Sequence, residues 1–246
     1  MEASDGSTDV LDTGSEQVIY SASSNIAIIK YMGKTSAVQN LPTNASISYT
    51  LNHLRSYVTL QTIDGAADCW EPLKGEGLLP IELSDKGKQK FLNHLQRIKD
   101  LWKVEANFCV RSANNFPSDC GIASSSSSFA ALTIAAVSVC DKLKPMRNPP
   151  DKTLLSSLSR QGSGSSCRSF FEPWAIWQSY AAQSWKGQFQ NLHHTVMLLD
   201  SNKKEVSSSE AHMKVTSSPD FPNRLINVKK RLHQIEKAND QGNWND

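Results

Sequence analysis

The chain reads PSDCGIASSSSS over residues 117–128 and continues directly as FAALTIAAVSVCDKL over residues 129–143. The second segment is apolar enough to form a largely buried helix, and the first is a loop of small residues that leads into it. The start of a helix presents free backbone N–H groups and the positive end of the helix dipole, and small side chains let an anion approach them closely. The stretch therefore predicts a phosphate-binding loop in which the hydroxyls of residues 124–127 add donors and can ligate Mg²⁺.

Two other elements carry groups that bind anions. Residues 161–168 read QGSGSSCR, in which two glycines permit backbone conformations closed to other residues and Arg168 offers a planar fork for oxyanions. Residues 23–34 read SSNIAIIKYMGK and place two lysines around Tyr31. A lysine in an apolar strand either meets an anion or extends from the strand end into solvent, and a serine-rich turn is also common as a solvated loop. The GxxxxGK[ST] and GxGxxG motifs are absent, so the three elements together indicate a polyanion site without a P-loop or Rossmann mechanism.

Composition indicates a globular chain without a large electrostatic field. The 246 residues are 39% hydrophobic and 20% charged, with 26 basic and 24 acidic residues and a formal net charge of +2. We therefore expect neither a nucleic acid nor a membrane as partner. The longest apolar run, residues 129–140, is broken by Thr133 and Ser138 and is shorter than the ~18 residues of a membrane span. The five cysteines are scattered without zinc or thioredoxin-like spacing, which predicts a reduced cytoplasmic protein.

Three regions are expected along the chain. Residues 1–17 are rich in serine and glycine, carry five acidic residues and lack Lys and Arg, which predicts a disordered tail and not a signal peptide. Three prolines within residues 144–150 indicate a boundary. We therefore expect one domain over residues 18–150 and a second over residues 151–246.

Hydrophobic patterns predict a sheet in the first third of the chain and helices after it. Phe91, Leu95, Ile98 and Trp102 form a helical stripe that begins after a cap at Ser84. The other expected elements are strands at residues 18–22, 26–31, 46–51, 57–63, 104–110 and 194–200, a helix that begins at Asp151, an aromatic segment with helical spacing at residues 170–177, and a helix at residues 221–235.

The tryptophans, histidines and one basic run have structural interpretations. Trp174 and Trp177 are expected to pack in a core or interface, not to stack on bases. The six histidines lack metal-binding spacing, and His193 and His194 would point to opposite faces of a strand. Residues 229–231, KKR, fit the solvated face of an amphipathic helix.

Several motifs resemble, in the same order, those of diphosphomevalonate decarboxylases, which belong to the GHMP kinase superfamily. The resemblance extends from about Val18 to Leu232, whereas a generic GHMP kinase would share only the Gly/Ser loop. The matching segments are SNIAIIKYMGK (24–34), NLPTN (40–44) with SIS (46–48), NNFP (114–117) with GIASS (121–125), GSGS (162–165) with CRS (167–169), and KEVSS (204–208).

The resemblance implies an α+β fold of two layers, as in GHMP kinases. An N-terminal ATP-binding part, similar to domain 2 of ribosomal protein S5, would be followed by a ferredoxin-like part that is truncated here. It also implies transfer of the ATP γ-phosphoryl group to the tertiary hydroxyl of 5-diphosphomevalonate, after which phosphate and CO₂ leave to give isopentenyl diphosphate. Such an enzyme of the mevalonate pathway would be cytoplasmic and would use ATP and Mg²⁺, and a homodimer is left open.

The resemblance also implies roles for individual residues. Lys30 would stabilise charge at the transferred phosphoryl group, Ser125 and Arg168 would be the other catalytic residues, and Ser125 would ligate the metal. The substrate would be held by Tyr31, Lys34, Ser163, Ser165, Arg168 and Ser208. The ATP phosphates would be held by Gly121, Ala123, Ser124, Ser125 and Ser126. Phosphoryl transfer depends on positioning and charge neutralisation more than on covalent chemistry, which suits these residue types.

The chain departs from the family pattern at several points. Met32 replaces a tryptophan, residues 126–128 are serines in place of alanines, and FEP at residues 171–173 replaces small residues. Family members also continue past the point where this sequence stops, with an aspartate that acts on the substrate hydroxyl. Two alternatives are a related GHMP kinase that phosphorylates a mevalonate-like alcohol without releasing CO₂, and an inactive, binding-only fragment.

Overall fold

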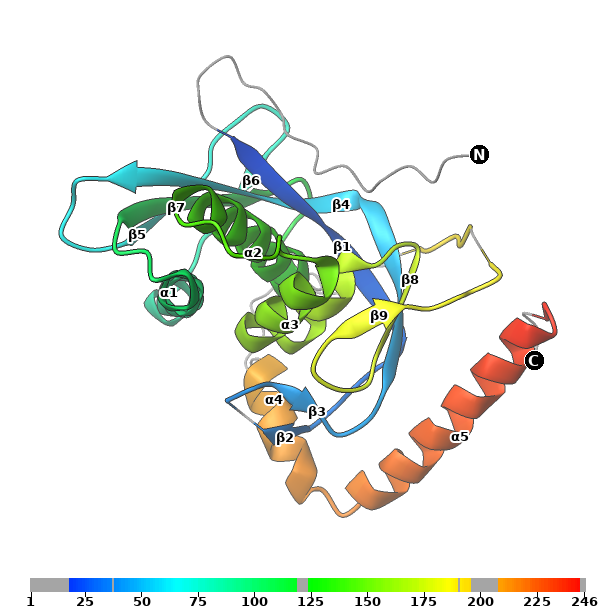
Figure 1. The fold of residues 1–246 in the computed structure, drawn as a ribbon. Coiled ribbons are helices and arrows are strands. Elements are labelled where there is room, and N and C mark those ends of the chain that lie inside the picture. Colours follow the sequence, from blue (N-terminus) through cyan, green and yellow to red (C-terminus); the bar gives the residue numbers. More distant parts are fainter. Residues whose placement is uncertain (1–17, 37, 119–123, 190, 196–207, 244–246) are drawn as a thin grey trace.

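A seven-stranded mixed sheet with helices packed against it forms the body of the protein (Figure 1). The structure is a computed structural model that describes residues 18–36, 38–118, 124–189, 191–195 and 208–243. The strands of the large sheet are β1 (Ile19–Ile29), β4 (Ser46–Ile63), β5 (Cys69–Pro72), β6 (Leu79–Pro80), β7 (Asn107–Asn114), β8 (Trp174–Trp177) and β9 (Ala182–Ser184). A separate two-stranded sheet is formed by β2 (Lys34–Ser36) and β3 (Leu41–Pro42). The predicted α+β class is confirmed.

Strand β4 is the centre of the large sheet and connects distant parts of the chain. Its one edge pairs with β1, and its other edge pairs with β7 near the C-terminal end and with β8 near the N-terminal end. The pairs are antiparallel except that of β5 with β7, which is parallel. Strand β8 belongs to the predicted second domain but completes the sheet of the first, and a division near residue 150 stays a prediction.

The strands are longer than the sequence pattern predicted. The two strands expected at residues 18–22 and 26–31 are one strand, β1, and those expected at 46–51 and 57–63 are one strand, β4. The β1–β4 register shifts between Ser23 and Ser24 without ending the pairing. Buried polar residues at this shift interrupt the hydrophobic alternation, which is why each strand reads as two.

Three helices cover one face of this sheet. They are α1 (Asp85–Trp102), α2 (Ser124–Leu143) and α3 (Lys152–Gly162). As predicted, α1 is capped by Ser84, whose side chain accepts from Gly87 N, and α3 is capped by Asp151, whose side chain accepts from Leu154 N. Helix α2 packs against α1, α3, β1 and β4 and supplies the centre of the core (Figure 1). Within the described residues α2 alone is long and apolar enough to cross a membrane, and most of that stretch is buried inside the protein.

Two predicted loops are helical. Residues 124–128 form the first part of α2, so the serines belong to the helix and not to the loop before it. Residues 161–168 comprise the end of α3 and most of a 3₁₀ helix, η1 (Gly164–Phe170). Neither Gly162 nor Gly164 has a positive φ. The prediction that these two glycines adopt backbone conformations closed to other residues was therefore wrong.

The aromatic segment at residues 170–177 is not a helix, because its second half is strand β8. Trp174 and Trp177 are 1% and 0% exposed, which confirms that both pack in the core. The alternate exposure that marks a surface strand is missing here because all four residues of β8 are buried. The strand expected at residues 194–200 falls mostly outside the described residues, as does the tail at 1–17.

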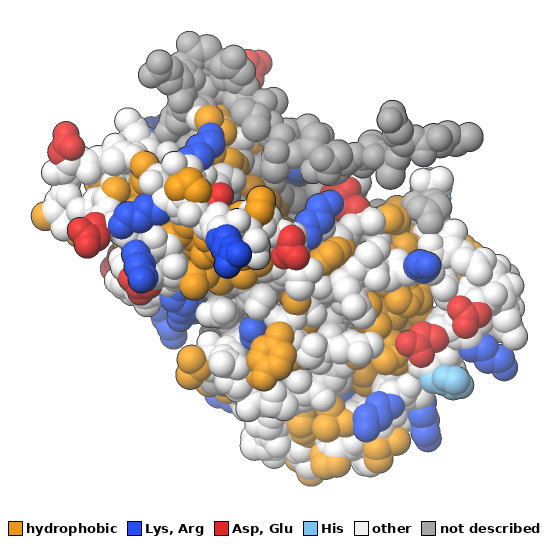
Figure 2. All heavy atoms as spheres, in the orientation of Figure 1, with side chains coloured by type: hydrophobic (Ala, Val, Ile, Leu, Met, Phe, Trp, Pro, Cys, Tyr) orange, Lys and Arg blue, Asp and Glu red, His pale blue; other side chains and the backbone are white. Residues whose placement is uncertain are grey.

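The C-terminal helix α5 (Phe221–Asp240) packs against the sheet face opposite α1 to α3. Its residues Val228, Leu232 and Ile235 contact a cluster that includes Ile47 and Trp174. Ser46 and Ser48 alternate with Ile47, and Ser46 faces η1, so Ile47 faces the other side. Figure 2 shows hydrophobic side chains gathered beside α5, while Lys, Arg, Asp and Glu are interspersed over the whole view, including along α5. Helix α4 (Ser208–Lys214) and the short 3₁₀ helix η2 (Val215–Ser217) precede α5.

Candidate active site

Lys30 marks the point where the chain leaves strand β1. Its side chain is exposed, and its carbonyl oxygen accepts hydrogen bonds from Asn44 Nδ2 at 3.2 Å and from Arg224 Nη2 at 3.0 Å. The backbone at Lys30 is thus held from two sides while the ammonium group extends into solvent. This position fits the interpretation of a lysine at a strand end, and its catalytic role stays a prediction.

Tyr31 is enclosed by aromatic rings and by η1. The ring stacks on His212 with 4.3 Å between centroids and an interplanar angle of 13°, and it meets Trp177 edge-on at 4.6 Å. A Cβ atom at Gly164 would lie 2.5 Å from the Tyr31 hydroxyl oxygen, so only glycine permits this approach. Burial raises the pKa of Tyr31 to about 12, and nearby Arg168 opposes that shift. Tyr31 is therefore neutral, and its hydroxyl lies close to Gly164 of η1.

Arg168, in η1, is a buried cation held by neutral groups. Its Nε and Nη2 donate to Asn25 Oδ1 at 3.3 and 3.1 Å, and its Nη1 donates to Ser46 Oγ at 2.8 Å. The side chain is 3% exposed, and among the described residues no carboxylate forms an ion pair with it. Burial lowers the pKa of Arg168. A buried guanidinium without an anionic partner is costly, so an anion bound nearby would be strongly favoured.

The start of α2 offers one exposed hydroxyl. Ser125 is exposed, Ser124 is half-buried, and Ser126 is fully buried with its hydroxyl hydrogen-bonded to that of Ser165 in η1. The first turn of α2 carries no acidic residue that would neutralise the helix dipole. Among the described residues at this helix start, Ser125 thus presents the most exposed hydroxyl, and its helical turn carries no acidic side chain.

Buried polar groups connect this helix start to the sheet. Ser56 Oγ donates to Asn114 Oδ1 at 2.6 Å and lies 2.7 Å from Ser127 Oγ and 3.1 Å from Ser128 Oγ. The Ser127 hydroxyl also donates to Ser124 O at 3.2 Å. The hydroxyl of Ser127 is thus buried and bonded inside the protein, whereas the ligand roles of Ser124, Ser125 and Ser126 stay predictions.

Lys34 is connected to the end of α3 through Asn40. Lys34 Nζ donates to Asn40 Oδ1 at 2.6 Å, and Asn40 Nδ2 donates to the carbonyl oxygens of Arg160 and Gln161, both at 3.0 Å. Asn40 has a φ of 51°, a left-handed conformation that asparagine tolerates. Burial, with a smaller contribution from Lys90, lowers the pKa of Lys34. The ammonium group is thus directed by neutral partners and is not paired with a carboxylate among the described residues.

The structure brings together some of the predicted residues. Tyr31 contacts η1 at Gly164, and Ser165 and Arg168 lie within the same helix, one bonded to α2 and the other facing Tyr31. Ser163 is the N-cap residue of η1. Ser208 begins α4, but its side chain is not among those described, and Gly121 and Ala123 lie outside the described residues.

Three residues of the site were not singled out from the sequence. Asn25 and Asn40 lie inside the motifs quoted above, and a polar residue within an apolar strand was the available signal for Asn25. His212 carried no signal, because histidines were tested only for metal spacing. Its ring contacts Tyr31, and its Nδ1 accepts from Gly33 N at 3.1 Å.

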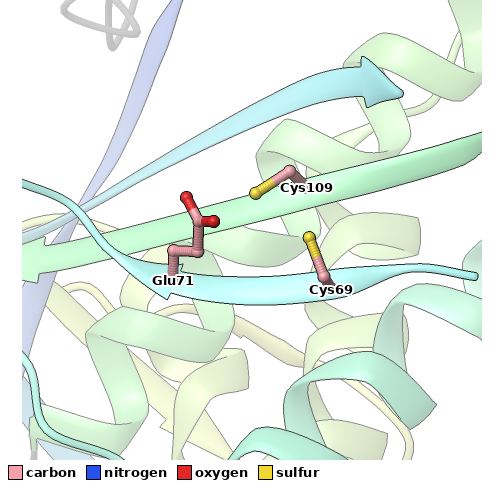
Figure 3. Close-up of side chains that lie close together, drawn as sticks. All are labelled: Cys69, Glu71 and Cys109. Atoms are coloured by element: carbon pink, nitrogen blue, oxygen red, sulfur yellow. The ribbon is translucent and has the colours of Figure 1, made fainter. Parts of the chain in front are cut away.

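A second cluster lies on β5 and β7. The ligand atoms of Cys69, Glu71 and Cys109 all lie within 4.8 Å of one another (Figure 3). Glu71 Oε2 already accepts from Arg111 Nε at 2.8 Å, and burial, helped by the hydrogen bond to Cys69, raises the pKa of the Cys109 thiol to about 12. With its carboxylate paired and its buried thiol protonated, the cluster does not present a ready set of metal ligands.

Comparison with known proteins identifies the family. The model described as the diphosphomevalonate decarboxylase-like N-terminal domain matches residues 22–188. The chain belongs to the diphosphomevalonate decarboxylase-like family. The predicted family and GHMP-type fold are thereby confirmed. The matched range contains most of β1 and all of α2 and η1, and it ends before α4.

Relatives and solved structures agree with this assignment. The diphosphomevalonate decarboxylase of Schizosaccharomyces pombe is 33% identical over 253 residues, which cover 90% of this chain and 60% of that protein. A mevalonate diphosphate decarboxylase structure from Legionella pneumophila is 39% identical with a TM-score of 0.83, and the match covers 92% of this chain and 71% of that one. The protein in a complex of MDDEF with MVAPP, AMPPCP and magnesium is 28% identical with a TM-score of 0.73, and the match covers 89% of this chain and 66% of that one. The chain thus spans about 60% of the length of the curated relative.

Proposed function

We propose that this chain carries the ATP-binding and substrate-binding part of a diphosphomevalonate decarboxylase. In the reaction, the tertiary hydroxyl of 5-diphosphomevalonate takes the γ-phosphoryl group of ATP and releases ADP. The C–O bond to the new phosphate then breaks as the carboxylate leaves as CO₂, and the electron pair of the broken C–C bond forms the double bond of isopentenyl diphosphate. Family membership and the likeness to a complex with MVAPP, AMPPCP and magnesium support this proposal.

The observation that carries the proposal is the buried charge of Arg168. Its hydrogen-bond partners, Asn25 and Ser46, are neutral, and no described carboxylate compensates it. The substrate carries a diphosphate and a carboxylate, so it supplies the anionic groups that this environment lacks. Two of the five N–H groups of the guanidinium are left for a ligand after the three hydrogen bonds described.

The substrate would lie where β1 ends against η1. Tyr31 and Lys34 would contact its diphosphate together with Ser163 and Ser165, and Lys30 would reach the transferred phosphoryl group from the strand end. Ser208, at the start of α4, would complete this pocket. Neutral partners around Lys34 and Arg168 leave their charges available to the substrate, which favours these roles.

ATP would bind at the start of α2. The backbone N–H groups of the predicted residues would donate to its phosphates; these residues are Gly121, Ala123, Ser124, Ser125 and Ser126. Ser126 would contribute its backbone N–H alone, because its hydroxyl is already bonded to Ser165. Mg²⁺ usually takes one or two protein ligands and completes its shell with phosphate oxygens and water. The exposed Ser125 hydroxyl beside a helix start without acidic residues fits this arrangement, and the ion would neutralise charge on the phosphates. The proposal includes a cytoplasmic location, and it leaves the homodimer open.

Binding and product measurements on this chain test the proposal. Isothermal titration calorimetry should give saturable binding of 5-diphosphomevalonate and of AMPPCP with Mg²⁺. With ATP present, release of ADP, phosphate and CO₂ in equal amounts establishes the decarboxylase. Release of ADP without CO₂ would indicate the related kinase, binding without turnover would indicate a binding-only protein, and failure to bind 5-diphosphomevalonate would overturn the proposal.

A further inference from the structure

His212 connects a helix outside the matched family domain to the proposed substrate site. We propose that its neutral imidazole is a positioning residue, which fastens helix α4 to residues 31–33 and thereby holds Tyr31 in place for the substrate diphosphate. This inference rests on the proposed function and assigns His212 a role that does not require contact with the substrate.

Two contacts made by one ring carry the inference. His212 Nδ1 accepts a hydrogen bond from Gly33 N at 3.1 Å, and the ring lies parallel to that of Tyr31 with 4.3 Å between centroids. The backbone at Gly33 has a φ of 91°, a conformation that other residues rarely adopt, so the amide that meets His212 has a specific direction. A single side chain of α4 therefore fixes both the ring of Tyr31 and the turn that follows it.

The contacts of Tyr31 on the side away from His212 show why the stacking matters. Its hydroxyl lies against Gly164 and its ring edge meets Trp177, so η1 and β8 hold it on one side and His212 on the other. Without His212 the ring has lost its stacking partner and can turn away from η1. The same turn leads directly to Lys34, the other proposed diphosphate contact on this segment.

The charge state of His212 follows from its surroundings. An N–H that donates to Nδ1 requires a lone pair there, so the ring carries its hydrogen on Nε2 and is neutral. The groups that face it are the cations Lys34 and Arg224 and the phenol of Tyr31, while Glu210 on its own helix is paired with Lys214. Burial, followed by Lys34 and Arg224, lowers the pKa of His212 to about 4. Protonation would set an N–H against the Gly33 N–H and break the attachment.

The attachment couples α4 to substrate binding. Ser208, a proposed substrate contact, lies one turn before His212 at the start of the same helix. A ligand that binds only when α4 is seated must stabilise that seating, and seating must increase its affinity by the same factor. The nucleotide site at the start of α2 makes no described contact with His212. Loss of His212 should therefore affect the two ligands unequally.

Three variants separate the two contacts. His212→Phe keeps a ring and lacks the acceptor, His212→Asn keeps an acceptor close to the position of Nδ1 and lacks the ring, and His212→Ala lacks both. The matched control is His53→Ala, an exposed histidine on β4. Calorimetry should show the Kd for 5-diphosphomevalonate raised about tenfold or more in His212→Ala and less in the other two, which retain one contact each. The Kd for AMPPCP with Mg²⁺ should stay within about twofold of the parent.

Measuring the Kd for 5-diphosphomevalonate over a range of pH adds a second test, because a merely structural role of His212 would not make the affinity depend on its protonation. The ratio of Kd values for wild type and His212→Asn cancels titration of the ligand itself, and it should change as pH falls from 6 towards 4, where His212 takes up a proton. Equal affinity for 5-diphosphomevalonate in wild type and His212→Ala, or equal losses for both ligands, would overturn the inference. If wild type itself fails to bind 5-diphosphomevalonate, the proposed function fails instead.

Discussion

The hydroxyl of Ser126, in the first turn of α2, is hydrogen-bonded to the hydroxyl of Ser165 in η1. Ser126 is fully buried and Ser165 is half-buried. The bond joins the helix proposed to receive ATP to the helix that carries Arg168. The two proposed ligand sites are thus built around one shared contact and not on separate parts of the fold.

Breaking this contact should cost stability. Ser126→Ala is expected to lower the free energy of unfolding by about 1 kcal/mol, since a typical hydrogen bond contributes that much. Ser165→Ala should cost a similar amount, and the double variant should cost less than the sum because both remove the same bond. Urea unfolding of the four proteins measures this coupling. Additive losses would show that the two hydroxyls act independently.

Ser125→Ala should separate nucleotide use from stability. The hydroxyl of Ser125 is exposed, so its removal is expected to change the free energy of unfolding by less than about 0.5 kcal/mol. Loss of a proposed Mg²⁺ ligand should weaken the binding of AMPPCP only when Mg²⁺ is present. Titrations with Mg²⁺ and with EDTA measure this difference, and Ser184→Ala, at an exposed serine on β9, is the control. The same loss under both conditions would remove Ser125 from the metal site.

Arg168→Lys should reduce affinity for 5-diphosphomevalonate at least tenfold. An ammonium cannot reproduce the fork that donates to Asn25 and Ser46, so the charge would lose its fixed direction. The control is Arg111→Lys, a surface change at an ion pair with Glu71. Calorimetry and turnover over a range of substrate concentrations measure the effect. Unchanged constants for Arg168→Lys would place this residue outside the site.

Gly164→Ala should act on the substrate through Tyr31. The new methyl group would lie 2.5 Å from the Tyr31 hydroxyl oxygen and must displace the ring. We expect weaker binding of 5-diphosphomevalonate and little change for AMPPCP. Gly65→Ala is the matched control, because its methyl would meet only the flexible end of Ile63 at 3.2 Å. A normal Kd for 5-diphosphomevalonate in Gly164→Ala would show that Tyr31 does not need this position.

Local signals in the sequence predicted the helices and the family better than the polar interior. Caps at Ser84 and Asp151 and the apolar stripe of α5 depend on neighbouring residues, so pattern analysis finds them. Strand β8 was predicted as helical from the spacing of the aromatic residues, and its four buried residues lack the alternation that would have marked a strand. Buried strands of this kind are specified by partners far away in sequence, here Ser46 to Tyr49 of β4.

The candidate site was predictable where chemistry is local and not where it is shared between elements. Arg168 stood out because a planar cation ends a segment of small residues, whereas Tyr31 was assigned to the site only through the resemblance to the family. Their partners are far away in sequence. Asn25, which accepts from Arg168, lies 143 residues before it, and His212, which stacks on Tyr31, lies in α4 near the other end of the chain. The partner of Ser126 is Ser165, 39 residues later, so no local signal in the sequence shows that the Ser126 hydroxyl points inward. Which serine of a serine run faces a ligand depends on helix rotation, and packing decides that rotation.

The last prediction concerns acid stability and His94. His94, in α1, is 1% exposed, and its Nε2 lies 2.9 Å from Thr133 Oγ1. The Thr133 hydroxyl donates its one hydrogen to Phe129 O at 2.7 Å, so His94 must donate from Nε2. Among the described residues Nδ1 of His94 has no hydrogen-bond partner, and the charged ring would bury an unpaired N–H there, so the neutral form is favoured. Burial, with a smaller effect of Arg97, lowers the pKa of His94 to about 3.

This shift makes the folded state lose stability in acid. Between the unfolded pKa of about 6.5 and the folded pKa of about 3, the unfolded chain binds a proton at His94 that the folded chain does not, so the free energy of unfolding falls as pH is lowered. His94→Leu removes the titrating group and should flatten the loss between pH 7 and pH 5 by about 2 kcal/mol. At pH 7 the variant should lie within about 1 kcal/mol of the parent, because Thr133 keeps its bond to Phe129. Urea unfolding at both pH values, with His53→Leu as the exposed control, measures this difference, and parallel pH profiles for His94→Leu and the parent would contradict a buried neutral histidine.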